Sequence, residues 1–307
     1  MSDFNFQIYN KNALTMIFLS KIFLQLDIGS KLPTFDDLSS ELGVARGTIQ
    51  KALKSLQAAK AVEIRSRGHM GSYLTNKNNK SLLNSANINS FLGAMPLPYS
   101  KTYEGLATGI ITSMENKYDI PVHIAYMRDA VKRIEEMLKG NYDFTIVCKS
   151  SAQKAIDKNN TIEIVADFGP TSYLSSHVIL FSDSRSSFIT DGMRVGLALG
   201  SSDQIKKTKE LCKNKRVEFV TLAYDQVIPA LKEKYIDATV WNKDEINDLI
   251  VQVKSKSIES NDDDTTAVLL ANNNKKELIK IFKEIINIEE VRKIQTAVIK
   301  QEMPPKY

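Results

Sequence analysis

The segment from Leu38 to Leu56 constrains the fold of this 307-residue chain more than any other. Apolar residues recur at helical spacing on both sides of Gly43, which predicts two short helices joined by a tight turn. Glycine permits that turn because it has no Cβ, and Val44 would fill the corner between the crossed helices. This pattern is typical of a helix-turn-helix, whose second helix enters the major groove of DNA.

The flanking residues predict a third helix and a hairpin around this motif. Residues 12–26 are apolar at helical spacing, and Thr34 stands at the N-cap position of the first motif helix. Two short β-like runs, 62–64 and 72–74, surround a turn that contains Gly68. The expected order is therefore helix, helix, turn, helix and hairpin.

Polar side chains gather near the start of the second motif helix, where a recognition helix meets base edges. The Arg46 guanidinium can bind guanine through two hydrogen bonds, and the Gln50 amide suits adenine. Lys51 and Lys54 suit phosphate groups, which supply affinity without sequence information. The candidate DNA contacts on the helices are Thr34, Arg46, Thr48, Gln50, Lys51 and Lys54.

The excess positive charge of the chain lies in its first quarter. Residues 1–80 contain 11 Lys and Arg against 6 Asp and Glu, whereas residues 81–307 contain 30 of each. A basic segment joined to a neutral one is typical of a protein that binds a polyanion and has a second function. The charge distribution therefore favours double-stranded DNA as the partner of the N-terminal domain.

Residues 10–75 resemble the winged helix-turn-helix of GntR-type bacterial regulators. The resemblance rests on a Leu-Pro pair before Thr34, a Gly-Val-x-Arg-x-Thr run from Gly43, an Ala-Leu-x-x-Leu run and the wing glycines, in that order. It implies that Arg46 and Thr48 contact DNA and that the wing tip enters the minor groove. The wing-tip candidates are Arg65, Arg67, Gly68 and His69.

Two departures from that family bear on the DNA sequence recognised. Asp36 and Asp37 stand where many members carry an arginine, and Gln50 replaces another arginine. These changes leave the operator sequence open. Because one helix-turn-helix contacts only a few base pairs, we expect a homodimer on a pseudo-palindromic operator, joined through the first helix or through a C-terminal helix.

Residues 76–90 are rich in Asn, Ser and Lys, which predicts a linker between two domains, 1–75 and 91–307. Beyond it, short apolar runs alternate with amphipathic segments, which predicts a parallel α/β architecture. The expected strands are 91–97, 122–127, 142–148, 163–166, 177–181, 195–199, 217–222, 238–241 and 266–270. The expected helices are 103–117, 130–139, 203–214, 225–234 and 275–300.

Polar residues follow several of these strands and begin the next helices. In open α/β sheets ligands gather at the carboxyl ends of strands, where helix N-termini offer free N–H groups. The set predicts a cleft for a small polar or anionic metabolite, although Ser and Thr are also ordinary helix caps. The candidate ligand contacts are Pro98, Tyr99, Ser100, Thr102, Tyr103, Ser150, Ser151, Tyr173, Ser201, Ser202, Asp203, Trp241 and Asn242.

The larger domain resembles type 2 periplasmic-binding-protein folds in two places. In each, residues 142–147 and 231–238, a helix is followed by an aspartate and a buried strand. Together with the N-terminal motif, residues 95–110 (MPLPYSKTYEGLATGI) resemble the YhfZ family of regulators. The resemblance implies a two-lobed α/β effector-binding domain behind a winged helix, and it leaves the effector open.

Catalytic and metal-binding motifs are lacking in the sequence. The three histidines are scattered, and Cys148 and Cys212 lack metal-ligand spacing. We interpret Cys148 as a small buried hydrophobe, because a thiol nucleophile would need His177 to fold close to it. We expect no catalytic residue, metal or cofactor. An enzyme that acts on a small anionic metabolite and carries an appended helix-turn-helix stays the alternative.

Two further observations favour the cytoplasm. No apolar run approaches the ~20 residues of a membrane span, and Met1–Tyr9 lack the pattern of a secretory signal. We therefore expect a cytoplasmic transcriptional regulator that binds operator DNA and a small-molecule effector and does not contact a membrane.

Overall fold

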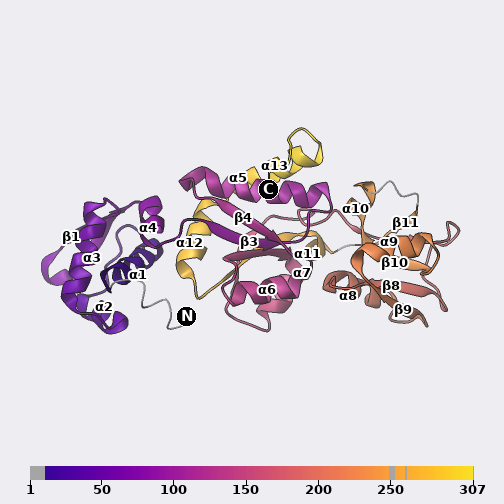
Figure 1. Ribbon diagram of the computed structural model, residues 1–307, viewed down its shortest axis with the longest axis horizontal. Helices are drawn as coiled ribbons and strands as arrows, with labels where there is room; N and C mark the ends of the chain where they lie inside the picture. The colour runs from indigo at the N-terminus through magenta and orange to yellow at the C-terminus, as the bar shows by residue number, and fades with distance from the viewer. Residues whose placement is uncertain (1–10, 249–252, 260, 307) are drawn as a thin grey trace. The chain divides into compact units, whose positions relative to one another are not determined.

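The computed structural model describes residues 11–248, 253–259 and 261–306 (Figure 1). Residues Met1–Tyr9, on which the expectation about a secretory signal rests, lie outside that range. The chain divides into two compact units. The first comprises the residues up to Phe91 with 117–121 and 275–284, and the second comprises 92–116, 122–274 and 285–307.

Within the described residues 11–77, the first unit folds as three α-helices followed by a hairpin, in the order that the sequence predicts. Its elements are α1 (Lys11–Gln25), α2 (Phe35–Leu42), α3 (Arg46–Ala58), β1 (Val62–Ser66), the short 3-10 helix η2 (Gly68–Met70) and β2 (Ser72–Lys77). α1 packs against α3, and Phe23, Ile49 and Leu56 are buried in the core of this unit. β1 and β2 pair antiparallel, which places η2 at the tip of a wing.

The start of α2 and the turn after it follow the predicted chemistry. The Thr34 hydroxyl accepts a hydrogen bond from the Asp37 N–H, and the Asp37 carboxylate accepts one from the Thr34 N–H in return. Gly43 has a φ of 62°, in the left-handed region that favours glycine. The predicted N-cap and turn are therefore confirmed, and they set the crossing of α2 and α3.

Residues 76–90, expected to form a linker, contain the helix α4 (Asn79–Ser85). The Asn78 side chain caps it by accepting a hydrogen bond from the Ser81 N–H, and Leu82 and Leu83 are fully buried. α4 packs against α1. Two buried leucines and one helix cap thus form a helix in a segment that is otherwise polar. The composition of the segment alone does not indicate this helix.

Helix α12 (Lys276–Ile285) belongs mainly to the first unit, although it lies almost 200 residues beyond α4 in the chain. The Lys280 ammonium donates to the Gln25 carbonyl oxygen at 2.8 Å and pairs with Asp27. The Lys77 ammonium donates to the Leu26 carbonyl oxygen at 2.7 Å. Both cations therefore satisfy carbonyl groups at the end of α1, where the helix dipole favours positive charge.

The expectation of one helix over 275–300 is wrong. α12 ends at Ile285, and α13 (Ile288–Ile299) begins with Asn287, whose side chain accepts a hydrogen bond from the Glu290 N–H. Both halves are apolar at helical spacing, so periodicity alone joins them. The Asn cap and the acidic first turn are the local signals of a new helix.

The second unit contains two five-stranded sheets (Figure 1). The first has the order β4-β3-β5-β12-β6 and the second has the order β11-β7-β10-β8-β9. The strands are β3 (Phe91–Met95), β4 (Val122–Tyr126), β5 (Phe144–Cys148), β6 (Ile162–Asp167), β7 (His177–Phe181), β8 (Arg194–Ala198), β9 (Glu218–Leu222), β10 (Ala238–Asn242), β11 (Lys254–Ser257) and β12 (Ala267–Asn272). The remaining helices are α5 (Lys101–Tyr118), α6 (Ala130–Leu138), α7 (Lys149–Ile156), α8 (Ser202–Leu211), α9 (Tyr224–Lys232), α10 (Lys243–Asp248) and α11 (Asp262–Thr265).

Both sheets are mixed, whereas the alternation of strands and helices predicts parallel ones. β3 and β5 pair in parallel, as do β8, β9 and β10. β12 runs antiparallel to β5 and β6, and β7 runs antiparallel to β10 and β11. β7 and β12 are buried along their whole length. A continuous apolar run does not indicate strand direction, so the sequence does not reveal these reversals.

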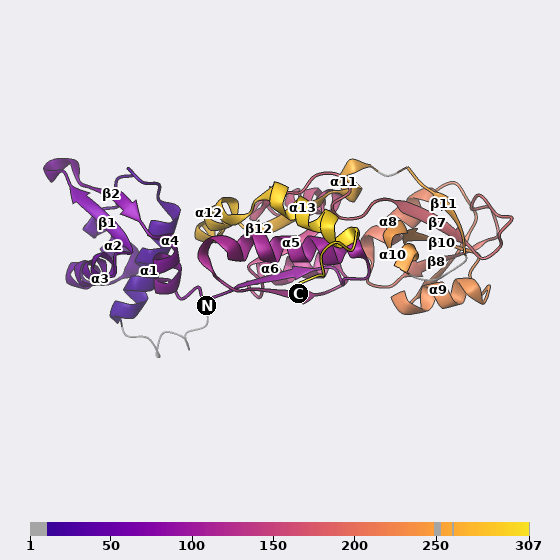
Figure 2. The same cartoon turned by 90° about the horizontal axis from the view of Figure 1, so that it is seen from above.

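Helices α5 and α13 lie side by side (Figures 1 and 2) because α5 presents two glycines to α13. A Cβ atom at Gly109 would lie 2.7 Å from the Val291 carbonyl oxygen, and one at Gly105 would lie 2.7 Å from the Gln295 carbonyl oxygen. These distances are shorter than a carbon–oxygen contact allows. Glycine is therefore required where the two backbones approach.

We expect the substitution Gly109→Ala to lower the free energy of unfolding by roughly 1–3 kcal/mol, the usual cost of overpacking. The new methyl group meets backbone rather than a flexible side chain, so the helices must move apart. Urea unfolding of the full chain measures the effect. Gly47→Ala is the matched control, because no atom lies within 4 Å of a Cβ there. Equal stability of the two variants would contradict this packing.

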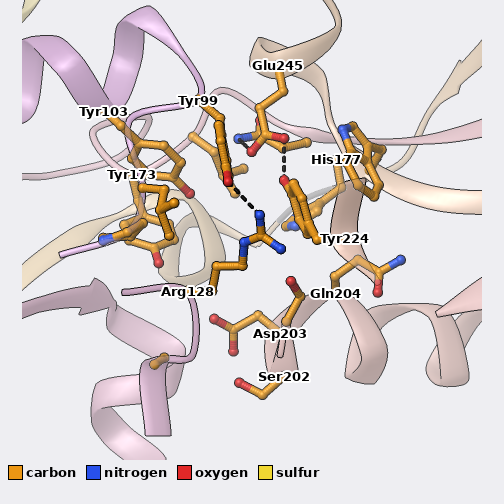
Figure 3. A pocket seen from close by; sticks show the side chains of 17 residues that line it. Tyr99, Tyr103, Arg128, Tyr173, His177, Ser202, Asp203, Gln204, Tyr224 and Glu245 are labelled. Atoms are coloured by element: carbon orange, nitrogen blue, oxygen red, sulfur yellow. Dashed lines mark hydrogen bonds between the residues drawn. The ribbon is translucent and has the colours of Figure 1, made fainter. Parts of the chain in front are cut away.

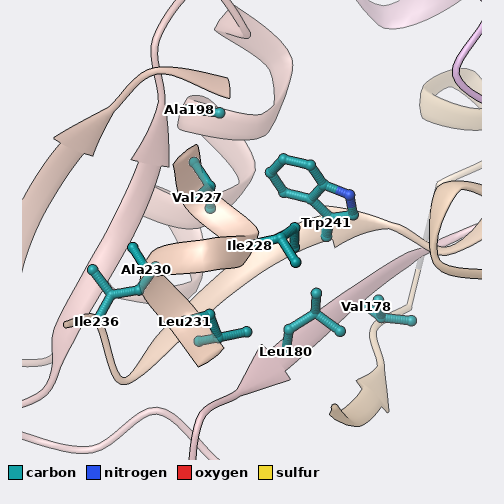
Figure 4. Packing of buried hydrophobic residues seen from close by; sticks show 9 residues of the cluster. All are labelled: Val178, Leu180, Ala198, Val227, Ile228, Ala230, Leu231, Ile236 and Trp241. Atoms are coloured by element: carbon teal, nitrogen blue, oxygen red, sulfur yellow. The ribbon is translucent and has the colours of Figure 1, made fainter. Parts of the chain in front are cut away.

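Helix α9 covers part of the second sheet with an apolar face (Figure 4). Val227 and Leu231 are fully buried against Leu180 of β7 and Trp241 of β10. The indole ring of Trp241 is held in this cluster, and the residue also lines the cavity described next.

Candidate functional site

The second unit contains a cavity of about 100 Å³ (Figure 3). Its lining side chains come partly from residues that precede the second sheet in the chain and partly from the second sheet and its helices. Residues that precede the second sheet in the chain contribute Pro96, Leu97, Tyr99, Tyr103, Arg128, Ala130, Tyr173 and Leu174. The second sheet and its helices contribute His177, Ser201, Ser202, Asp203, Gln204, Tyr224, Trp241, Asn242 and Glu245.

Most of the predicted ligand contacts meet at this cavity, and their role in binding stays a prediction. Those that line it are Tyr99, Tyr103, Tyr173, Ser201, Ser202, Asp203, Trp241 and Asn242. Ser150 and Ser151 line neighbouring cavities instead. The Ser100 hydroxyl accepts a hydrogen bond from the Tyr103 N–H, and the Thr102 hydroxyl donates to Asp244. Pro98 is not among the residues that line the cavity.

Arg128 and two tyrosines form a stacked cluster in the cavity (Figure 3). The rings of Tyr99 and Tyr224 are stacked with their centroids 5.5 Å apart. The Arg128 guanidinium lies 4.5 Å from the Tyr224 centroid and donates a 2.5 Å hydrogen bond to the Tyr99 hydroxyl. Cation–π contact and hydrogen bonding together hold a positive charge at the cavity wall. The cluster joins Arg128, which follows β4, to Tyr224, which begins α9.

Glu245 supplies a buried carboxyl group to the same cavity, next to Tyr224 of this cluster. It accepts a hydrogen bond from the Tyr224 hydroxyl and another, at 3.4 Å, from the Asn242 amide. Burial raises the pKa of Glu245 to about 7, although the bonds from Tyr224 and Asn242 act in the opposite direction. The group therefore changes charge near neutral pH.

Asp203 faces the cavity from the start of α8. Its carboxylate accepts a 2.5 Å hydrogen bond from the Ser151 hydroxyl and a longer one, at 3.5 Å, from the Cys148 thiol. Cys148 and His177 line a neighbouring cavity together. Burial and the Asp203 charge raise the pKa of the Cys148 thiol to about 11. The thiol is therefore protonated at neutral pH and a weak nucleophile.

Arg128, Tyr224 and Glu245 are absent from the set predicted from the sequence. Arg128 and Tyr224 follow the ends of β4 and β9, so the strand-end rule that selects Asp203 also applies to them. Glu245 lies on α10, a helix that the sequence analysis does not anticipate. Its position three residues after Asn242 is the only local signal.

The predicted DNA contacts of the first unit lie on α3 and the wing. Arg46, Gln50, Lys51 and Lys54 have exposed side chains, and Thr48 is half-buried. The Arg46 guanidinium is paired with the Asp36 carboxylate. The wing-tip residues are also exposed, and the Arg67 guanidinium lies 4.6 Å from the centroid of the Tyr73 ring. Thr34 serves as the cap of α2, and its contact with DNA stays a prediction.

Within 11–248, 253–259 and 261–306, no group of three or more His, Cys, Asp or Glu side chains is arranged to hold a metal ion. Over the same residues, no helix is long and apolar enough to cross a membrane.

The family of the chain follows from comparison with known proteins. A family model described as the YhfZ C-terminal domain matches residues 78–307, most of the chain. The chain belongs to the YhfZ family. The Escherichia coli YhfZ protein is 33% identical over 232 residues, which cover 76% of this chain and 75% of that protein. A helix-turn-helix domain model matches residues 27–74, which confirms the motif predicted from the sequence.

Solved structures that are similar to this YhfZ-family chain share the fold of its larger, C-terminal part. YhfZ from Shigella flexneri matches with a TM-score of 0.61 and 29% identity, over 75% of this chain and 98% of that chain. The periplasmic aliphatic sulphonate binding protein SsuA from Escherichia coli matches with a TM-score of 0.52 and 14% identity, over 69% of this chain and 74% of that chain. The expected periplasmic-binding-protein-like fold is therefore confirmed.

Proposed function

We propose that this YhfZ-family chain is a transcriptional regulator whose affinity for operator DNA changes when a small polar or anionic metabolite binds in the second unit. The observation that carries the proposal is one chain that combines a helix-turn-helix with a binding-protein-like fold. The cavity lined by Arg128 and the stacked tyrosines supports a ligand site in that fold. The basic, exposed face of α3 supports contact with DNA.

The finer features of the first unit belong to the same proposal. We assign it to the GntR-like winged type, with α3 in the major groove and the wing tip, Arg65 to His69, at the minor groove. The protein would act as a homodimer in the cytoplasm, since two half-sites give the specificity that one helix cannot.

The effector would act by binding one conformation of the protein more tightly than another. A ligand shifts a conformational equilibrium only by its difference in affinity for the two states. Coupling of ligand to DNA is reciprocal, so the effector changes DNA affinity by the factor by which DNA changes effector affinity, typically 5- to 150-fold.

We expect a cytosolic metabolite, present at a concentration ~100 times its Kd for the full chain, to stabilise the protein by roughly 2.7 kcal/mol. The same metabolite should change the Kd of the protein for operator DNA. A thermal-shift screen followed by DNA titration measures both effects. Arg128→Gln should remove the stabilisation, because it removes the guanidinium group that lines the cavity. Tyr235→Phe is the control, since that exposed tyrosine does not line the cavity.

The alternative of an enzyme rests on Glu245. A buried carboxyl group with a pKa of about 7 beside the Tyr224 hydroxyl is an arrangement that general acid–base catalysis also uses. The same screen separates the two functions. A metabolite that binds and is recovered unchanged favours an effector, and a metabolite that is consumed favours the enzyme.

A further inference from the structure

Arg133 of α6 is a fully buried side chain behind the wall of the cavity. Its guanidinium donates to the backbone carbonyl oxygens of Met127 and Arg128, the latter at 2.6 Å, and to the Tyr173 hydroxyl oxygen at 3.3 Å. Its Nε atom has no hydrogen-bond partner in the described part of the chain. These partners are neutral, and among the described residues no carboxylate forms a direct ion pair with Arg133.

A buried cation without a counter-ion is costly, because taking a charge out of water is unfavourable unless an opposite charge replaces the water. Two carboxyl groups, Asp203 and Glu245, also line the cavity, but neither is directly paired with Arg133 in the described part of the chain. Asp203 accepts from the Ser151 hydroxyl and Glu245 accepts from the Tyr224 hydroxyl instead. The Arg133 charge is therefore not directly paired, and an anion bound beside Tyr173 would lie close to it.

Tyr173 connects Arg133 to the cavity. Its hydroxyl oxygen accepts the bond from Arg133, so its proton is left to donate into the cavity that Tyr173 lines. Burial raises the pKa of the Tyr173 hydroxyl above its ordinary value, which keeps that proton in place at neutral pH. A hydroxyl that accepts from a cation becomes a stronger donor to an anion.

Arg133 also positions the second cation. By holding the carbonyl oxygens of Met127 and Arg128, it fixes the backbone from which the Arg128 side chain reaches the Tyr99 and Tyr224 rings. Two arginines thus act on one cavity, Arg128 by lining it and Arg133 through a hydroxyl group.

We infer that the effector carries a carboxylate-like anionic group, which binds at the Tyr173 hydroxyl and the Arg128 guanidinium and supplies the counter-charge that Arg133 lacks. This inference rests on the proposed function, since it names the chemistry of the effector in the same cavity. Tyr173 is a binding residue in this arrangement, and Arg133 is a positioning residue.

The experiment uses acetate as the probe and acetamide as its neutral match, at constant ionic strength. Trp241 is the single tryptophan of the chain and lines the cavity, so its emission in the full-length protein reports binding there. Acetate should change the emission with saturation, and acetamide should not. Tyr173→Phe should weaken acetate binding by about 10-fold or more, the usual value of a hydrogen bond to a charged group.

Matched variants separate this role from a structural one. Arg133→Met should weaken acetate binding as Tyr173→Phe does, and Lys132→Met, at the exposed neighbouring position of α6, should not. Tyr142→Phe removes a hydroxyl outside the cavity and should bind acetate like the parent protein. If Arg133→Met fails to fold, Tyr173→Phe alone decides, because it removes a single oxygen atom.

Three outcomes would overturn the inference. They are acetate binding that Tyr173→Phe leaves intact, equal binding of acetate and acetamide, and no response to acetate. None of these outcomes contradicts the proposed function, because that function is tested by a different measurement, the change in DNA affinity when an effector binds. A neutral metabolite that changes DNA affinity would leave the regulator standing and refute the anionic effector.

Discussion

Replacing Arg46 by alanine is expected to weaken binding to operator DNA by about 10- to 100-fold, since a bidentate arginine–guanine contact is worth roughly 1–3 kcal/mol. The side chain is exposed near the N-terminal end of α3. The loss should be specific, so the variant keeps its affinity for non-specific DNA. Fluorescence anisotropy with a selected operator and a scrambled duplex, at fixed salt, measures the two affinities.

Lys54→Ala is the matched control on the same helix. A lysine that contacts phosphate should weaken binding to every sequence and reduce the salt slope by about one. The Arg46 guanidinium also pairs with Asp36, so the Arg46 substitution is repeated in an Asp36→Ala background. If Arg46 contacts a base, the loss of specificity persists there. Unchanged operator binding by Arg46→Ala in both backgrounds would exclude α3 as the recognition helix.

The helix-turn-helix of the first unit could be predicted from the sequence because the residues that cap its helices and form its turn act locally. Thr34 caps α2 through atoms three residues away, and Gly43 allows its turn by its own φ angle. Such contacts depend on the order of residues rather than on distant parts of the chain. The same reasoning fails for α4, where the burial of Leu82 depends on packing against α1.

The cavity could be predicted in part, for a similar reason. Strand ends collect at one edge of a sheet, so the rule finds Asp203 and Trp241 without knowledge of the fold. It does not find Arg133, which is buried and acts through a hydroxyl group 40 residues away in the chain. Nor does it predict the reversed directions of β7 and β12, since buried strands of either direction have the same apolar composition.

Replacing Glu245 by glutamine is expected to stabilise the second unit by about 3 kcal/mol above pH 7 and to change little below pH 4.5. Burial raises the pKa of this carboxyl group from 4.5 to about 7 in the folded protein. Between those values the folded state holds a proton that the unfolded state has lost. The stability of the parent protein therefore falls as pH rises through this window, at about 1.4 kcal/mol per unit of pKa shift.

Glutamine has nearly the same shape and no charge, so its amide oxygen keeps an acceptor for the Tyr224 hydroxyl while the pH-dependent penalty disappears. Urea unfolding followed by Trp241 emission between pH 4.5 and 8 measures the difference, because that tryptophan lies in the same unit. Glu233→Gln, at the exposed end of α9, should run parallel to the parent protein across the whole range. If the stability of Glu245→Gln also runs parallel to that of the parent protein, the pKa of Glu245 is not raised in the folded state. The carboxyl group is then ionised at neutral pH, and neighbouring groups in the cavity stabilise its negative charge. A variant that gains stability only at high pH would instead establish that Glu245 is neutral near pH 6, where the arginines are then the dominant charges that an effector meets.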